Sequence, residues 1–156
     1  MQRTLVILKP DAVQRGLVGR ILARLEAKGL KMVGLRMRRL DRPLAERLYA
    51  PHKGKDFYEP LVRFMTSGPA VFLVVEGKGA VAVVRKMLGA TFGPDADPGT
   101  VRGDFGVSKR FNLVHGSDSP ESAAREIALF FSGDDLVEWN PADWPHRYDF
   151  STGECV

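Results

Sequence analysis

The sequence predicts an α+β fold in which helices pack on a four-stranded, mainly antiparallel sheet. Four short apolar runs of strand length lie at residues 3–8, 31–40, 70–76 and 111–115. Between them, apolar residues recur at helical spacing, so the elements follow the order strand, helix, strand, helices, strand, helix, strand, helix. We expect the helices to cover one face of the sheet, as in a ferredoxin-like sandwich.

Local signals mark most of these elements. The first strand is a continuous apolar run, and Lys9-Pro10 ends it in a turn because proline fixes its backbone and lacks a donor. Gly29 ends the first long helix, whose apolar residues are Val18, Ile21, Leu22 and Leu25. Asp41 then caps a short helix that contains Leu44 and Leu48.

Three further helices are expected at residues 57–65, 80–88 and 119–131. The last has the strongest signal, with Ser119 as cap, Pro120 at the first helical position and Glu121 in the first turn. Residues 89–105 are rich in Gly, Pro and Asp and predict a loop too long to be an incidental connection. We therefore expect this loop to have a functional role.

Length and composition indicate one domain over residues 1–156, with a C-terminal extension from about residue 133. The chain has 156 residues, of which 44% are hydrophobic, enough for a substantial core. The extension is rich in aromatic residues without periodicity. This pattern favours a segment that lies on another surface, either its own core or a neighbouring subunit; the aromatic residues are Trp139, Trp144, Tyr148 and Phe150.

Composition also narrows the class of partner. The formal net charge is +4, which reflects a basic surface and also suits an acidic nucleotide. Cys155 is the only cysteine, so no intrachain disulfide is possible. No signal peptide is evident and no apolar run reaches about 18 residues. We expect a soluble, cytoplasmic protein without a membrane partner.

His115 is the first candidate for chemistry. It ends the fourth predicted strand, just before Gly116 and the capped helix, although a lone histidine is more often structural. Glu126 lies at the border of that helix's buried face and can point back towards the strand. A carboxylate bonded to one imidazole nitrogen fixes the ring and frees the other nitrogen for attack. Lys9, at the edge of the first strand, is well placed to meet a ligand.

Five segments of the chain resemble nucleoside diphosphate kinases. They are KPD at residues 9–11, VQRGLVG at 13–19, FMTSGP at 64–69, PGTVRGDF at 98–105 and NLVHGSDS at 112–119. They occur in the family's order with compatible spacing, and the similarity covers about residues 2–139. The resemblance implies a ping-pong reaction that moves the γ-phosphoryl group of a nucleoside triphosphate, typically ATP, through a phosphohistidine to a nucleoside diphosphate.

The resemblance also assigns roles to particular residues. It implies that His115 is the nucleophile, that Glu126 orients its ring and that Tyr49 packs beside it. Lys9 and Asn112 would hold the ribose hydroxyls near the transferred group, Phe57 would stack on the base, and Ser117 would hydrogen-bond near the catalytic site. The expected phosphate contacts are Arg85, Thr91, Arg102 and His52.

Physical chemistry supports such a set. Phosphoryl transfer depends on positioning and charge neutralisation, so several cations and a metal must surround the polyanion. We expect Mg²⁺ to be carried by the nucleotide phosphates, because the sequence has no tight carboxylate cluster to hold it. Stacking on an aromatic ring tolerates every base. The family assembles as hexamers or tetramers, and the sequence does not choose between them.

Two rival interpretations remain open at this point. Gly77, Gly79 and Ala82 match a dinucleotide-binding fingerprint, although the parallel βαβ units it requires are not evident. A nucleic-acid binding protein is the other rival, because of the basic residues Arg36, Arg38, Arg39, Lys109 and Arg110. A solvated basic face explains these residues better in the absence of a recognised nucleic-acid motif.

The chain departs from the family pattern just before Asn112. Lys109-Arg110-Phe111 stand where Val-Gly-Arg is often found. This departure affects how the base rests in its cleft and leaves the nucleotide preference undetermined.

Overall fold

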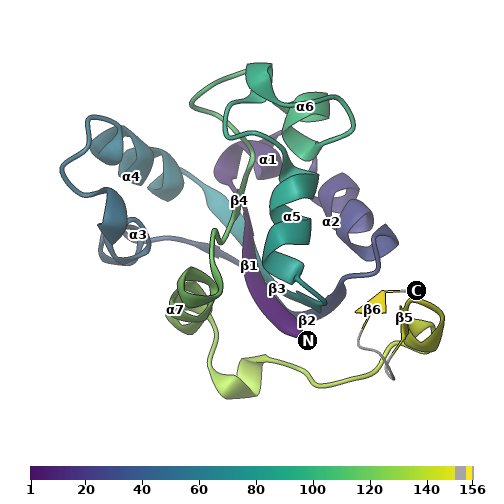
Figure 1. Cartoon of the computed structure of the whole chain (residues 1–156). Helices are drawn as coiled ribbons and strands as arrows, with labels where there is room; N and C mark the ends of the chain where they lie inside the picture. Colours follow the sequence, from purple (N-terminus) through teal and green to yellow (C-terminus); the bar gives the residue numbers. More distant parts are fainter. Residues whose placement is uncertain (150–153, 156) are drawn as a thin grey trace.

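The centre of the computed structural model, which describes residues 1–149 and 154–155, is a four-stranded antiparallel sheet (Figure 1). Its strands lie in the order β2-β3-β1-β4. Each neighbouring pair is antiparallel, so the predicted fold class is confirmed. The strands are β1 (Gln2–Leu8), β2 (Lys31–Arg39), β3 (Pro69–Gly77) and β4 (Val114–Gly116).

Helices cover both faces of the sheet, so the expectation of one covered face is wrong (Figure 1). Because side chains alternate along a strand, the unbroken apolar run of β1 needs apolar partners on both faces. Val6 and Leu8 face a core with α1 (Pro10–Gln14), α2 (Val18–Ala27) and α5 (Ala80–Leu88). Leu5 and Ile7 face a second core with α3 (Arg42–Leu48), α4 (Tyr58–Thr66) and α7 (Pro120–Phe130).

Strand β4 begins at Val114 rather than at the predicted residue 111. Leu113 interrupts the extended backbone with a φ of 68°, which is unusual for a leucine. Its amide donates to Oδ2 of Asp11 at 3.0 Å, and its carbonyl accepts from the amide of Lys9 at 2.8 Å. These bonds to the start of α1 account for the conformation and bring the residue before Leu113 close to Lys9.

Two segments expected to be irregular contain short helices. Pro10 starts α1 instead of only closing a turn, since the first helical position needs no backbone donor. The expected loop at 89–105 contains the 3-10 helix η2 (Gly93–Asp95) and α6 (Val101–Phe105). Thr100 caps α6 by accepting a hydrogen bond from the amide of Gly103. The predicted caps Asp41 and Ser119 are confirmed on α3 and α7.

The dinucleotide-binding interpretation is excluded by strand direction. Residues 77–82 do form a strand, a turn and a helix, because β3 ends at Gly77 and α5 begins at Ala80. However, β3 runs antiparallel to both of its neighbours, whereas the dinucleotide fold needs parallel βαβ units. In the described ranges, no helix has the length and apolar character needed to cross a membrane.

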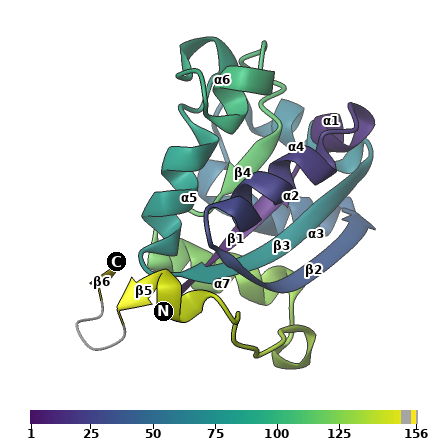
Figure 2. The same ribbon diagram turned by 90° about the vertical axis from the view of Figure 1, so that its right-hand side faces the viewer.

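The C-terminal extension lies on β2 of its own chain. After α7 it runs along one edge of the sheet from the α7 side towards the α2 side (Figures 1 and 2). The amide of Val137 donates to the carbonyl of Val33 at 2.7 Å, and Nε1 of Trp139 donates to the carbonyl of Met32 at 2.9 Å. Phe150 lies outside the described residues. The remaining elements are η1 (Ala50–His52), η3 (Gly133–Asp135), η4 (Trp144–His146), β5 (Tyr148–Asp149) and β6 (Glu154–Cys155).

Candidate active site

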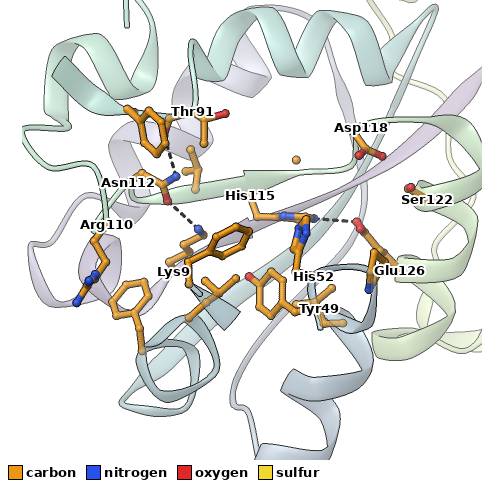
Figure 3. A pocket seen from close by; sticks show the side chains of 18 of the residues that line it. Lys9, Tyr49, His52, Thr91, Arg110, Asn112, His115, Asp118, Ser122 and Glu126 are labelled. Atoms are coloured by element: carbon orange, nitrogen blue, oxygen red, sulfur yellow. Dashed lines mark hydrogen bonds and ion pairs between the residues drawn. The ribbon is translucent and has the colours of Figure 1, made fainter. Parts of the chain in front are cut away.

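A cleft of about 560 Å³ opens beside the ends of β1 and β4 (Figure 3). Its walls come from distant segments: the β1–α1 junction, the stretch from α3 to α4, α5, the segment before β4, and α7. The fold thus gathers residues that lie far apart in the sequence. The predicted residues that line the cleft are Lys9, Tyr49, His52, Phe57, Arg85, Thr91, Arg102, Asn112, His115 and Glu126.

Glu126 holds the ring of His115. Its Oε2 lies 2.8 Å from Nε2 of His115, and the same oxygen accepts a hydrogen bond from the hydroxyl of Ser117 at 2.7 Å. Glu126 and Ser117 are buried, and Ser117 lies behind the cleft wall rather than in it. Within the described residues, Nδ1 of His115 has no hydrogen-bond partner. The histidine therefore has one nitrogen fixed and the other available.

The environment of Glu126 favours its ionised form. Burial opposes ionisation, but hydrogen bonds from His115 and Ser117 and the charge of Arg125 outweigh it, so the pKa of Glu126 lies below its ordinary value. Arg125 approaches the other oxygen, Oε1, at 3.5 Å. An ionised carboxylate at this position accepts hydrogen bonds only, so Nε2 of His115 carries the proton in this pair.

A chain of hydrogen bonds ties Lys9 to the segment before β4 (Figure 3). Nζ of Lys9 donates to Oδ1 of Asn112 at 2.7 Å, and Nδ2 of Asn112 donates to the carbonyl of Thr91 at 2.9 Å. Burial, together with the charge of Arg102, lowers the pKa of Lys9 to about 8. The structure thus holds a cation of reduced proton affinity in the cleft wall.

Arg102 is buried, and its guanidinium already holds the backbone. It donates to the carbonyls of Gly89 at 2.8 Å, Asn112 at 3.1 Å and Val114 at 2.7 Å. Burial and the charge of Arg85 lower its pKa to about 10. The expected role of Arg102 in phosphate binding is therefore joined by a structural role that the sequence did not suggest.

Aromatic rings form one wall of the cleft. The ring centroids of Tyr49 and His115 lie 6.3 Å apart in an edge-on arrangement, and His52 lies 5.4 Å from Phe57. The hydroxyl of Tyr49 is buried without a partner among the described residues. Phe57 is 49% exposed, with Nζ of Lys55 5.6 Å from its ring centroid, so part of the ring is available to a planar ligand.

Comparison with known proteins identifies the family. The family model described as nucleoside diphosphate kinase matches residues 2–136. The chain belongs to the nucleoside diphosphate kinase family. A nucleoside diphosphate kinase of Archaeoglobus fulgidus is 56% identical over 149 residues, which cover 96% of this chain and 99% of that protein. Another, from Ignicoccus hospitalis, is 56% identical over 138 residues, 88% of this chain and 94% of that protein.

Solved structures agree with this assignment. A halophilic nucleoside diphosphate kinase from Halobacterium salinarum, solved in complex with CDP, has a TM-score of 0.93 and 50% sequence identity, and the match covers 95% of this chain and 99% of that one. A family protein from Babesia bovis has a TM-score of 0.91 and 42% identity, and covers 95% and 100% of the two chains. The protein is therefore an enzyme of the phosphotransferase class.

Some residues in this nucleoside diphosphate kinase cleft were not predicted as site residues. Asp118, Ser122 and Arg125 line its histidine end (Figure 3 labels the first two). Helical spacing could have identified Ser122, because it precedes Glu126 by four residues on α7 and so shares its face. Arg125 directly precedes Glu126, about 100° away around the helix, so this spacing does not point to it. Phe92, from the expected loop, also lines the cleft, and no pattern in the sequence points to it.

The basic residues of the nucleic-acid interpretation are divided by the fold. Arg36 is bound internally, since it donates to the carbonyl of Phe130 at 2.8 Å and pairs with Asp135. Lys109 and Arg110 line the cleft. The cluster therefore does not act as one continuous basic surface.

Proposed function

We propose that the protein transfers the γ-phosphoryl group from a nucleoside triphosphate, typically ATP, to a nucleoside diphosphate through a phosphohistidine on His115. The supporting observation is the pair in which Glu126 binds Nε2 of His115 at 2.8 Å while Nδ1 has no partner among the described residues. Nε2 keeps its proton, so Nδ1 carries the lone pair. That lone pair is the nucleophile.

The reaction has two symmetrical halves. In the first, Nδ1 of His115 forms a bond to the γ-phosphorus, the bond from phosphorus to the bridging oxygen breaks, and the electron pair leaves with the nucleoside diphosphate. The ring gains positive charge as this bond forms, and the carboxylate of Glu126 stabilises it across the 2.8 Å contact. In the second half, a terminal phosphate oxygen of another nucleoside diphosphate forms a bond to this phosphorus, the bond from phosphorus to Nδ1 breaks, and the electron pair returns to the ring of His115.

The other cleft residues position the nucleotide. In this proposal, Lys9 and Asn112 hold the ribose hydroxyls and Tyr49 packs beside the histidine, while Ser117 steadies Glu126. Phe57 stacks on the base. The phosphate oxygens meet Arg85, Thr91, His52 and the N–H groups of Arg102 that its carbonyl partners leave free. Arginine suits this task because its planar guanidinium donates hydrogen bonds in pairs.

Mg²⁺ fits the cleft as an ion carried by the nucleotide. Among the described residues, no group of three or more His, Cys, Asp or Glu could hold a metal ion. Asp118 lines the cleft as an exposed carboxylate at the histidine end, and Mg²⁺ is typically bound by one or two carboxylates together with phosphate oxygens and water. The ion would neutralise phosphate charge, while the residues above bind and orient the substrate.

We also propose a cytoplasmic homo-oligomer, either a hexamer or a tetramer. Leu35 and Met37 are 51% and 58% exposed on β2, an edge strand of the sheet. The C-terminal extension covers this edge at Met32 and Val33, and exposed apolar side chains further along the edge favour association with another chain. The cytoplasm is where the nucleotides to be exchanged are found. Analytical ultracentrifugation measures the assembly; a monomer at micromolar concentration would contradict this part of the proposal.

The phosphohistidine can be tested directly. The protein is incubated with γ-labelled ATP and Mg²⁺, denatured, and examined for bound label that survives base, is lost in acid, and is discharged beforehand by GDP. We expect label on the wild type and none on the His115→Ala variant, with circular dichroism showing that the variant is folded. Absence of label on folded wild-type protein with intact ATP would overturn the proposal.

A further inference from the structure

The cleft is chemically different at its two ends. Its lining carboxylates, Asp118 and Glu126, both lie at the His115 end, whereas Arg110 lies at the opposite end (Figure 3). Lys109 precedes Arg110, is exposed, and also lines the cleft. The end away from the histidine thus offers cationic side chains and no carboxylate.

Arg110 adjoins the apolar wall formed by α4 and the residue before it. That wall consists of Phe57, Pro60, Leu61 and Phe64. Arg110, Pro60 and Phe64 also line an adjoining hollow that contains Glu59 and Arg63. Glu59 is bonded to Arg42 at 2.8 Å, so it does not neutralise the cations of the cleft.

Neither cationic side chain is committed to a partner. Within residues 1–149 and 154–155, no hydrogen bond or ion pair joins the side chain of Lys109 or Arg110 to a protein group. Nζ of Lys109 lies 5.9 Å from the centroid of the Phe92 ring, at the outer limit of a cation–π contact. Both groups can therefore turn towards a bound ligand.

The hydrogen-bonding chemistry of these groups is one-sided. Lysine and arginine side chains donate hydrogen bonds and cannot accept them. Hypoxanthine and guanine present an oxygen acceptor at C6, whereas adenine presents an amino donor there; uracil and cytosine differ in the same way at C4. Stacking on Phe57 does not distinguish these bases, because every base has a π-face. An edge of the cleft that carries only hydrogen-bond donors does distinguish these bases.

We propose that Lys109 and Arg110 make this cleft prefer oxo bases over amino bases. The inference rests on the proposed function, because it requires the base to stack at the Phe57 end while the phosphates meet His115. The rim of Lys109 and Arg110 then donates to the carbonyl oxygen of the base, and the amino group of adenine or cytosine meets only donors. Stacking on Phe57 allows every nucleotide to bind, and the hydrogen bonds from Lys109 and Arg110 determine which nucleotides bind more tightly.

Inosine diphosphate and adenosine diphosphate provide a matched pair of probes, since they differ only at the 6-position and in the proton on the neighbouring N1. Dissociation constants are measured by calorimetry with Mg²⁺ for the wild type, a Lys109→Met/Arg110→Met double variant, and Arg63→Met as control. Arg63 is an exposed arginine of the adjoining hollow that does not line the cleft. We expect the wild type and the control to bind inosine diphosphate about tenfold more tightly, as one well-placed base contact allows.

In the double variant, the ratio of the two constants should fall below about twofold. Equal constants in the wild type, or a preference retained by the double variant, would overturn the inference. Uniformly weaker binding of both nucleotides at an unchanged ratio would also overturn it, because the rim would then act only on phosphate charge. Binding requires no phosphoryl transfer, so this result is independent of the phosphohistidine test.

Discussion

Glu126 and His115 form a pair in which one carboxylate oxygen serves two donors. Oε2 of Glu126 lies 2.8 Å from Nε2 of His115 and 2.7 Å from the hydroxyl of Ser117. The pair joins β4 to α7 and is buried on the side of Glu126. Because the ring is fixed through Nε2, the orientation of Nδ1 is set by the packing of a helix against a strand.

Replacing Glu126 by alanine should slow phosphoryl transfer without abolishing it. The carboxylate orients the ring and stabilises its developing charge but forms no bond to phosphorus, so we expect kcat to fall by about 10²-fold. Single-turnover labelling of the purified variant measures the effect, with ADP affinity as a check on nucleotide binding. An unchanged labelling rate would show that another group holds the ring.

Activity should fall in mildly alkaline solution because Lys9 loses its charge there. Its pKa is lowered to about 8, so the ammonium, which in the proposal holds the ribose hydroxyls near the transferred group, loses its charge as pH rises through that value. We expect kcat/KM, which reports ionisation in the free enzyme, to fall about tenfold per unit above pH 8. A Lys9→Arg variant stays charged over this range, so its remaining activity should lack the fall. A flat wild-type profile up to pH 9 would contradict this assignment.

Replacing Tyr49 by phenylalanine should not destabilise the fold. The hydroxyl is buried without a partner in the described part of the chain, and burial together with the charge of Glu126 raises its pKa. Removing such a group costs no hydrogen bond, so the free energy of unfolding should stay the same or rise by up to about 1 kcal/mol.

Ser117→Ala provides the contrast to the Tyr49 variant. It removes a made hydrogen bond to Glu126 and should lower the free energy of unfolding by about 1 kcal/mol. Urea unfolding measures both variants. A Tyr49→Phe variant that is less stable than Ser117→Ala would show that the hydroxyl has a partner in solution.

Arg102 should be essential for stability as well as for nucleotide binding. Substitution by methionine removes the hydrogen bonds that Arg102 donates to the carbonyls of Gly89, Asn112 and Val114. Of these, the carbonyl of Asn112 keeps the amide of Val114 as a donor. We expect a loss of about 3 kcal/mol or more in the free energy of unfolding. Arg20→Met, at an exposed position, is the matched control and should change stability by less than about 0.5 kcal/mol. Equal stabilities of the two variants would contradict the structural role.

Features that depend on near neighbours were predictable from the sequence. The caps Asp41 and Ser119 were predictable because a cap is a local interaction, in which the side chain accepts from an amide three residues later. Helical spacing likewise predicted that Glu126 can point towards His115. The motif segments indicated the family before the structure did. Residues from four of the five segments line one cleft, and none from residues 13–19 does, but no local rule gives the distances between them.

Features that depend on contacts between distant segments were decided by the tertiary structure. Leu113 leaves the predicted strand because its backbone bonds to Lys9 and Asp11, about 100 residues away in the sequence. The aromatic composition of the tail predicted a contact, but only the fold showed that Trp139 bonds to Met32 on β2. The order of residues thus determined the elements, their caps and the chemical groups available. The position of each group depends on which apolar surfaces of the chain pack against each other and are removed from water. The pattern along the sequence does not contain that information.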